Sequence, residues 1–457
     1  MIRSNPGQKV SQSSTLRRLG LGTAVAVLAV AVAGCGALGG GNKTKTTPTV
    51  GQRVPVLSRI EAGTKVDPTL EVMPVLLPPA TVNADWAQAG GTASKSYGHL
   101  DLNEAPSRAW TVSIAGSSNK QRLAASPVVG GGQLFAMDTN GTVYAFDAET
   151  GRPKWKVNFK PGDNASSVFG GGVSYSDGRV FVTTGVGEVA ALDATNGSQV
   201  WKVKPGGPLR GSPTLAFNNV FVMSQNNQIY ALNAADGQLA WNEGGASTAS
   251  GVFGVAAPAA GQGSIVAGYS SGELIVYRYE NGRELWSDAL ARTSIATSVS
   301  TLTDVDADPI IDNGRVYALG QGGRMAAYEL VTGQRVWELS LAGISTPAIT
   351  GEWIFTLTDD GRILCIAKGT GKVRWLNQLA RYKNEEKRKD PIFWTGPVLA
   401  GNRLWIANSR GEVLSVDPGS GKTTPFTKLS DGVSLAPVVA NKTLYILDDG
   451  GKITAWR

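Results

Sequence analysis

Residues Gly141–Trp155 read GTVYAFDAETGRPKW. Val143–Phe146 is a short run that is apolar on both faces of an extended chain, which is typical of a buried strand. Asp147–Gly151 then favours a tight hairpin turn, because Asp and Thr side chains bond nearby amides and Gly accepts a positive φ. The stretch therefore predicts a strand, a turn and a second strand that carries an aromatic anchor, Trp155.

The same unit recurs along the chain. Its other copies are VAALDATNGSQVW (189–201), IYALNAADGQLAW (229–241), LIVYRYENGRELW (274–286), MAAYELVTGQRVW (325–337), ILCIAKGTGKVRW (363–375) and, more weakly, VLSVDPGSGKTTPF (413–426). The aromatic anchors are spaced by 38 to 51 residues; they are Trp110, Trp155, Trp201, Trp241, Trp286, Trp337, Trp375 and Phe426. A period of about 40–50 residues with four short strands per repeat indicates a β-propeller.

The two ends of the repeat region complement each other. Lys452–Arg457 reads as the third strand of a repeat whose fourth strand is missing, and Arg108–Val112 reads as a fourth strand with no repeat before it. Joining them completes one more repeat and removes two unpaired sheet edges, which are an aggregation hazard. The sequence therefore predicts an all-β, eight-bladed propeller over residues 81–457, closed by its N- and C-terminal strands.

The start of the chain looks like an export signal. Basic residues precede Leu19–Ala33, an uncharged apolar run shorter than a membrane-spanning helix, so residues 1–34 are predicted to be a signal peptide. Val32–Cys35 resembles a bacterial lipobox, which implies cleavage before Cys35 and lipidation of its thiol. Gly36 after the cysteine favours, by analogy with bacterial lipoproteins, the outer membrane. Residues 35–80, rich in Gly, Thr and Pro, are predicted to be a flexible tether.

Charge and composition narrow the class of protein. The formal net charge is +7, but four basic residues lie before Leu19, and the rest are scattered over turns. The densest charged run, Arg381–Asp390 (RYKNEEKRKD), is read as a solvated loop between blades, so no nucleic acid is expected as a ligand. The single histidine, His99, reads as structural. Cys365 lies in a strand as a small buried thiol, and no disulfide is expected once Cys35 is acylated.

Short matches to enzyme motifs carry little weight. Gly268–Gly272 fits the nucleophile-elbow pattern, but it joins two strands, whereas that motif joins a strand to a helix. Gly421–Thr423 ends like a phosphate loop, yet the required earlier glycine is Val416. Asp304–Asp308 has carboxylates at alternate positions, but Pro309 and Arg315 stand where a calcium loop needs Gly and Glu. No catalytic residue and no metal site are predicted.

Two resemblances to known families follow from these residues. The Ala-x-Asp-x-x-Thr-Gly-x-x-x-Trp core is similar to the tryptophan-docking repeat of quinoprotein dehydrogenases, which bind pyrroloquinoline quinone, although this chain lacks their vicinal Cys-Cys pair. The lipobox, the tether, the eight repeats and Leu302–Asp306 followed by Pro309–Ile311 resemble the BamB family, the propeller lipoproteins of the outer-membrane β-barrel assembly (BAM) machinery. That resemblance covers nearly all of the mature chain.

The BamB resemblance implies a scaffold without a cofactor. It implies lipid anchoring through Cys35 at the periplasmic face of the outer membrane, binding to the periplasmic domains of BamA and to other BAM members, and unfolded outer-membrane proteins as further ligands. Carried over, Asp304 and Asp306 would lie in the BamA-docking surface, with Val252 and Phe253 beside them. At those two positions the chain departs from the leucine-and-arginine patch of the family.

Alternatives stay open at this point. Asp304 and Asp306 could cap a turn, and Phe253 could pack in the core. A quinoprotein dehydrogenase would show cofactor absorbance and calcium dependence. A ligand-binding propeller of the cell envelope would hold a small sugar or peptide on its axis and have no barrel partner.

Overall fold

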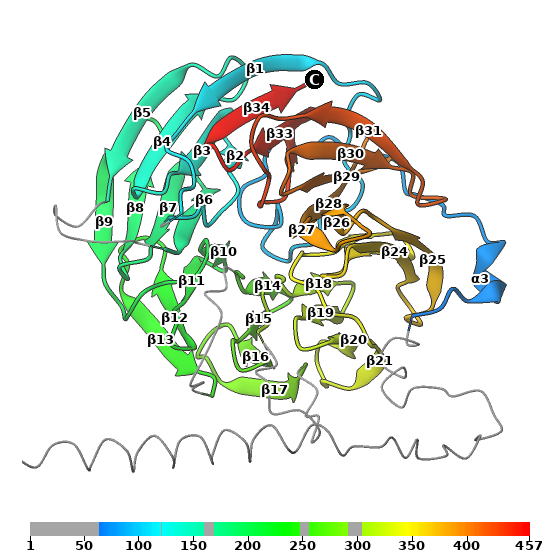
Figure 1. Cartoon of the computed structure of the whole chain (residues 1–457). Helices are drawn as coiled ribbons and strands as arrows, with labels where there is room; N and C mark the ends of the chain where they lie inside the picture. Colours follow the sequence, from blue (N-terminus) through cyan, green and yellow to red (C-terminus); the bar gives the residue numbers. More distant parts are fainter. Residues whose placement is uncertain (1–63, 120, 160–168, 247–255, 291–303) are drawn as a thin grey trace, which may run out of the picture. The chain divides into compact units, whose positions relative to one another are not determined.

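The computed structural model describes residues 64–119, 121–159, 169–246, 256–290 and 304–457. These residues belong to one compact unit, Leu57–Arg457. Within them, eight four-stranded antiparallel sheets follow one another around a ring (Figure 1), which we number as blades 1 to 8. The predicted all-β, eight-bladed propeller is confirmed. No helix in the described ranges has the length and apolar character needed to cross a membrane.

The strand bounds repeat from blade to blade. Blades 1 to 4 consist of β2 (Val128–Gly130), β3 (Gln133–Met137), β4 (Thr142–Asp147) and β5 (Pro153–Asn158); β6 (Gly171–Ser176), β7 (Arg179–Thr184), β8 (Val189–Asp193) and β9 (Gln199–Val203); β10 (Thr214–Ala216), β11 (Asn219–Met223), β12 (Gln228–Asn233) and β13 (Leu239–Gly244); and β14 (Ala259–Gly261), β15 (Ser264–Gly268), β16 (Glu273–Arg278) and β17 (Glu284–Ala289). Blades 5 to 7 consist of β18 (Ile310–Asp312), β19 (Arg315–Gly320), β20 (Arg324–Glu329) and β21 (Arg335–Leu339); β22 (Ala348–Thr350), β23 (Trp353–Leu357), β24 (Arg362–Ala367) and β25 (Val373–Gln378); and β28 (Trp394–Ala400), β29 (Arg403–Asn408), β30 (Glu412–Val416) and β31 (Thr423–Lys428).

Blade 8 joins the two ends of the propeller. It consists of β32 (Val438–Ala440), β33 (Thr443–Leu447), β34 (Lys452–Trp456) and β1 (Arg108–Ser113). Thr111 pairs with Thr454 in the antiparallel ladder between β1 and β34. This is the predicted closure, and it leaves no open edge between blade 8 and blade 1.

The core lies between neighbouring blades. In blade 1 the side chains of Phe135, Val143 and Ala145 are fully buried, and they share a cluster with Val173 and Val180 of blade 2. The fourth strand of a blade instead alternates between partly buried and exposed residues, as in β5. Three buried strands and one half-exposed outer strand explain why the sequence repeat is apolar on both faces before its turn and alternates after it.

Six of the seven outer-strand tryptophans bond the following blade. The seventh, Trp110 of blade 8, lies against Gly151 of blade 1, but its Nε1 has no hydrogen-bond partner in the described part of the chain. In the other six, the indole N–H donates a hydrogen bond of 2.7–3.0 Å to a backbone carbonyl in the turn between the third and fourth strands of the next blade; the pairs are Trp155 with Ala194, Trp201 with Ala234, Trp241 with Tyr279, Trp286 with Leu330, Trp337 with Lys368 and Trp375 with Pro418. The glycine of that turn lies against the indole ring. At Gly237 a Cβ would come within 2.7 Å of the Trp201 ring. The repeat therefore couples neighbouring blades through one aromatic residue and one glycine.

The exception at Phe426 has a structural reason. Phe426 faces blade 8, whose third and fourth strands are not joined by a turn, because its fourth strand is β1, which precedes blade 1 in the sequence. No turn carbonyl is present there to accept an indole N–H. Phe426 packs against Trp405 and Trp456 instead, with ring centroids 4.9 and 5.0 Å away.

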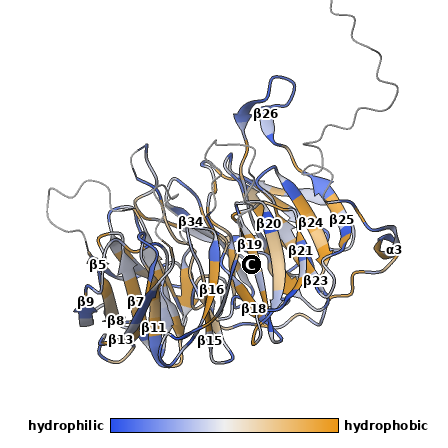
Figure 2. Ribbon diagram, turned by 90° about the horizontal axis from the view of Figure 1, so that it is seen from below, coloured by the Kyte–Doolittle hydropathy of each residue, from blue (hydrophilic) through white to orange (hydrophobic). Residues whose placement is uncertain are grey.

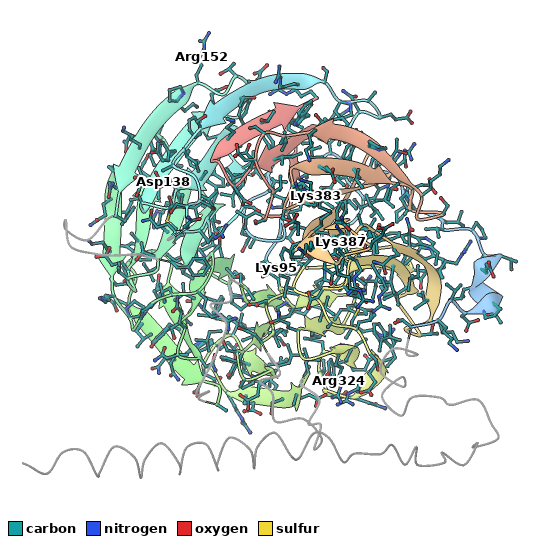
Figure 3. The ribbon with its side chains drawn as sticks, in the orientation of Figure 1. Lys95, Asp138, Arg152, Arg324, Lys383 and Lys387 are labelled. Atoms are coloured by element: carbon teal, nitrogen blue, oxygen red, sulfur yellow. The ribbon has the colours of Figure 1, made fainter. Side chains whose placement is uncertain are left out.

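Residues 64–107, which we call the lead-in segment, contact all eight blades. It contains the short helix α3 (Pro68–Glu71). Its backbone or side-chain hydrogen bonds reach each blade in turn; the partners are Val129, Tyr175, Leu215, Ala260, Ile311, Val373, Leu399 and Val439. Lys95 of this segment lies near the centre of the ring (Figure 3).

The lead-in segment also differs from the predicted tether. The tether was predicted to extend to Ala80, but Asp67 donates its N–H to Val373 O at 2.8 Å and forms an ion pair with Lys372. Val75 and Leu77 pack against the core of blades 6 and 7. Residues 64–80 are therefore held against the propeller by the contacts of Asp67, Val75 and Leu77, while Leu76 stays exposed.

The two ends of the propeller are not equivalent. The lead-in segment bonds the turns between first and second strands, as at Gly131, Gly401 and Asn441, so we call this end the lead-in face. Because strands alternate in direction, the connections between blades lie at the other end, which we call the connector face. The hairpin of β26 (Tyr382–Asn384) and β27 (Lys389–Pro391) stands out from it, between blades 6 and 7 (Figure 2).

Candidate partner-docking site

Asp304–Asp308 forms part of the connection from blade 4 to blade 5, on the connector face. Two backbone hydrogen bonds fix the start of the segment. Val305 N–H donates to Tyr269 O at 3.2 Å, and Gln321 N–H donates to Asp304 O at 3.0 Å. Val305 is fully buried. The segment thus has a defined path between two blades, and its acidic side chains have defined positions.

Asp304 and Asp306 converge on Arg210. One guanidinium nitrogen of Arg210, Nη2, lies 2.8 Å from Asp304 Oδ1 and 3.4 Å from Asp306 Oδ1. Arg210 is placed by its backbone, which donates to Met223 O and accepts from Gly171 N–H in the connection between blades 2 and 3. The ion pair therefore joins loops that belong to different parts of the ring.

The carboxylates of Asp304 and Asp306 differ in burial. The side chains of Arg210 and Asp304 are 1% exposed, whereas that of Asp306 is 11% exposed. Burial, followed by the charge of Asp304, raises the pKa of Asp306 to about 7, although Arg210 counteracts the shift. Asp359, in the turn between β23 and β24, adds a further negative charge, and burial raises its own pKa to about 6. The site is an acidic cluster held by one buried arginine.

Asp308 has a different role. Its carboxylate accepts the N–H of Ala257 at 2.8 Å, and its own N–H donates to Thr346 Oγ1. Its charge also acts on the buried Lys95, whose Nζ donates to Ala89 O and Thr214 Oγ1. Burial lowers the pKa of Lys95 to about 8. Lys95 thus joins the lead-in segment to blade 3 through Thr214.

The predicted site residues are only partly brought together. Asp304 and Asp306 share one cluster, but Asp304 is buried and Asp306 alone keeps some exposed surface. Val252, Phe253 and the predicted lipidation site Cys35 lie outside the described residues. The sequence analysis missed Arg210, which is 94 residues from Asp304 and lies in no recognisable motif.

The other motifs take the structural roles expected of them. Gly268–Gly272 is the turn between β15 and β16, and Gly421–Thr423 lies at the turn into β31. Cys365 is fully buried in β24, which raises the pKa of its thiol. His99 is buried, with Nδ1 2.8 Å from Pro78 O and Nε2 accepting from Asn402 N–H at 3.1 Å.

Within the described ranges, no metal-binding set accompanies the acidic cluster. Among the residues with described positions, no three His, Cys, Asp or Glu side chains are arranged to hold a metal ion. The positive charge between Asp304 and Asp306 is the guanidinium of Arg210.

Comparison with known proteins identifies the family. The family model for the outer membrane protein assembly factor BamB matches residues 101–166 and 139–377, which together are more than half of the chain. This chain belongs to the BamB family. Among its relatives, the outer membrane protein assembly factor BamB of Yersinia pestis is 26% identical over 358 residues, which cover 77% of this chain and 88% of the relative.

Solved structures agree with the BamB fold. BamB from Moraxella catarrhalis matches with a TM-score of 0.66 at 18% identity, covering 77% of this chain and 99% of that structure. The quinohemoprotein alcohol dehydrogenase of Comamonas testosteroni matches with a TM-score of 0.64 at 13% identity, covering 82% of this chain and 81% of the enzyme. At these identities the likeness shows a shared propeller fold, and fold alone does not fix function.

Proposed function

We propose that this BamB-family chain is a non-catalytic scaffold lipoprotein of the outer-membrane β-barrel assembly machinery. Lipid on Cys35 would hold it at the periplasmic face of the outer membrane. Its connector face would bind the periplasmic domains of BamA and support insertion of barrel proteins into the membrane.

The acidic cluster around Arg210 supports docking at the connector face most directly. The cluster is a group of charged side chains at a junction between blades. Backbone hydrogen bonds fix the segment that carries Asp304 and Asp306 before any partner binds. Preorganised charges orient a partner and speed its approach more than they add affinity. At the opposite end, the lead-in segment already occupies the turns that a partner would meet.

Asp304 and Asp306 would have different roles, one structural and one in partner binding. Asp304 is buried against Arg210 and would hold the loop in shape. Asp306 keeps exposed surface and lies farther from Arg210, so its carboxylate is the one that can meet a basic side chain of BamA. A charge reversal at Asp306 should therefore weaken docking without the cost of leaving a buried Arg210 unpaired.

The test is a mild-detergent pull-down of the tagged full-length chain from its own membranes. We expect the wild type to recover BamA and Asp306→Arg to lose it. Asp431→Arg is the matched control, because Asp431 is a partly exposed aspartate on the connection between blades 7 and 8 of the same face. A thermal melt of each variant by circular dichroism checks that the propeller stays folded.

Three outcomes would change the proposal. Equal recovery with all three proteins keeps the scaffold function and moves the interface away from Asp306. Loss with both variants shows a general charge effect. Failure of the wild type to recover a barrel protein overturns the assembly function and favours a ligand-binding propeller, and a quinone absorbance spectrum in the purified protein would favour the dehydrogenase.

A further inference from the structure

The β26–β27 hairpin is a built projection of the connector face. Tyr382 pairs with Pro391 and Asn384 with Lys389 in its short ladder. At its base Ile392 is buried and its N–H donates to Arg381 O, while Trp394 Nε1 donates to Ala380 O at 2.8 Å. The hairpin therefore stands on a packed stem.

Its turn is organised so that the basic side chains face solvent. Glu385 Oε1 accepts the backbone N–H groups of Arg381 and Tyr382 at 2.7 and 3.1 Å, and Asn384 Oδ1 accepts Lys387 N–H at 2.9 Å. These bonds use one acidic side chain of the hairpin internally. The basic side chains are exposed and form no ion pair within 4 Å in the described part of the chain; they are Arg381, Lys383, Lys387, Arg388 and Lys389.

An exposed aromatic ring lies beside the stem. Phe393, between β27 and β28, is 64% exposed, the largest exposed fraction of any aromatic side chain in the described residues. Its backbone N–H is fixed by Ser409 Oγ at 3.1 Å. The hairpin thus combines five exposed cations, which outnumber its acidic residues Glu385, Glu386 and Asp390, with one apolar ring.

The lead-in segment begins at the same edge of the ring. Thr64, the first described residue, accepts a hydrogen bond of 3.0 Å from Arg362 Nη1 at the start of β24. Arg362 in turn bonds Asp360, in the turn whose Gly361 lies against Arg381 of the hairpin stem. The chain that leads back toward Cys35 therefore starts next to the hairpin, at the connector-face end of blade 6.

We propose that the β26–β27 hairpin binds the anionic phospholipid surface of the membrane that carries the lipid anchor. This rests on the proposed lipidation of Cys35. Basic side chains near an anionic leaflet strengthen membrane binding, and aromatic side chains are enriched at the interface between membrane and water. A second contact of this kind would fix which side of the propeller faces the membrane, which an acyl chain on a tether does not do.

A lipid surface fits the hairpin better than an acidic protein does. Specific protein interfaces are built around side chains buried in well-packed pockets. Here the cations are spread over both strands and the turn of a projecting hairpin, shown by Lys383 and Lys387 (Figure 3), and every residue from Lys383 to Pro391 is exposed. Mobile phosphate headgroups can meet such a convex, scattered set without a matching surface.

The test is co-sedimentation of the full-length chain with vesicles of phosphatidylcholine alone or mixed with phosphatidylglycerol. The quantity compared is the ratio of binding to the mixed vesicles over binding to phosphatidylcholine alone. In this ratio, contributions from the apolar residues near the N-terminus cancel. Each basic residue near an anionic surface is worth about fivefold in binding. The variant K383E/K387E/K389E should therefore lower the ratio by about 100-fold, and added salt should lower the wild-type ratio.

The matched control makes the same change in charge elsewhere. R152E/K154E/K156E alters three exposed basic residues at the start of the outer strand of blade 1 and in the turn just before it, and should leave the ratio within about twofold of the wild type. An unchanged ratio for the hairpin variant, or an equal drop for the control, overturns the proposal. The pull-down of BamA separates the two ideas: a hairpin variant that loses BamA but keeps its vesicle ratio makes the hairpin a protein-docking element and leaves the scaffold function standing.

Discussion

The contact between tryptophan and glycine at seven of the eight blade junctions can be tested at Gly237. Gly237 has φ +78°, and a Cβ there would lie 2.7 Å from Cε3 of the nearly buried Trp201 ring. Gly263 has φ +77°, yet an added Cβ would meet no atom within 4 Å. Both substitutions by Ala incur the left-handed backbone cost of about 1–2 kcal/mol. Only Gly237→Ala adds overpacking, about 1–3 kcal/mol more.

Urea unfolding of the two variants and the wild type, followed by circular dichroism, measures the difference. With a shared slope, the shift in midpoint gives the change in the free energy of unfolding. We expect Gly237→Ala to lose about 2–5 kcal/mol and Gly263→Ala about 1–2 kcal/mol. Equal losses would refute the idea that the indole ring excludes a side chain at the turn, and would leave backbone conformation as the sole reason for glycine.

Three further predictions concern buried polar contacts. Trp201→Phe removes the indole N–H that donates to Ala234 O, so the free energy of unfolding should fall by at least about 1 kcal/mol in the same urea assay. Because the folded protein keeps the Asp306 proton between its unfolded pKa of 3.8 and about 7, stability should fall as pH rises through that range, and Asp306→Asn should flatten the curve. For Lys95 the unfolded chain keeps the proton between about pH 8 and 10.5, so stability should rise with pH there; Lys95→Met should abolish that rise in melts recorded across the range.

The repeat and its closure could be predicted because their signals are local. Val143 and Ala145 sit in a run that is apolar on both faces, Asp147–Gly151 follows as a turn, and the same order returns at a regular spacing. The weak copy at Phe426 was visible as well. Its reason was not, because the hydrogen bond from an indole N–H to a turn carbonyl of the next blade is seen only in the structure.

The acidic cluster was only half predictable. Asp304 and Asp306 stand out as alternating carboxylates, but their partner Arg210 comes from a connection two blades earlier. Nothing near Arg210 in the sequence marks it as buried. A pairing between distant loops depends on the ring geometry, which no local pattern encodes.

The first part of the lead-in segment, residues 64–80, was predicted to be tether for a different reason. Many contacts of the lead-in segment with the blades use backbone groups, as where Trp86 and Val129 exchange two hydrogen bonds. Backbone pairing places little demand on side-chain identity, so the prolines and small residues around Val75 and Leu77 read as tether. Only the location of blade 6 beside them shows that these residues are packed.

The closing blade has a consequence for the order of events during biogenesis. Thr111 and Thr454 face each other in blade 8 across 343 residues of sequence, so β1 has no strand partner until almost the whole chain is present. Bringing such distant segments together is slow, and an unpaired strand edge meanwhile invites association with other chains. A chain delivered from its N-terminus would therefore expose β1 throughout delivery, and ring closure would be the step that most needs protection by a chaperone.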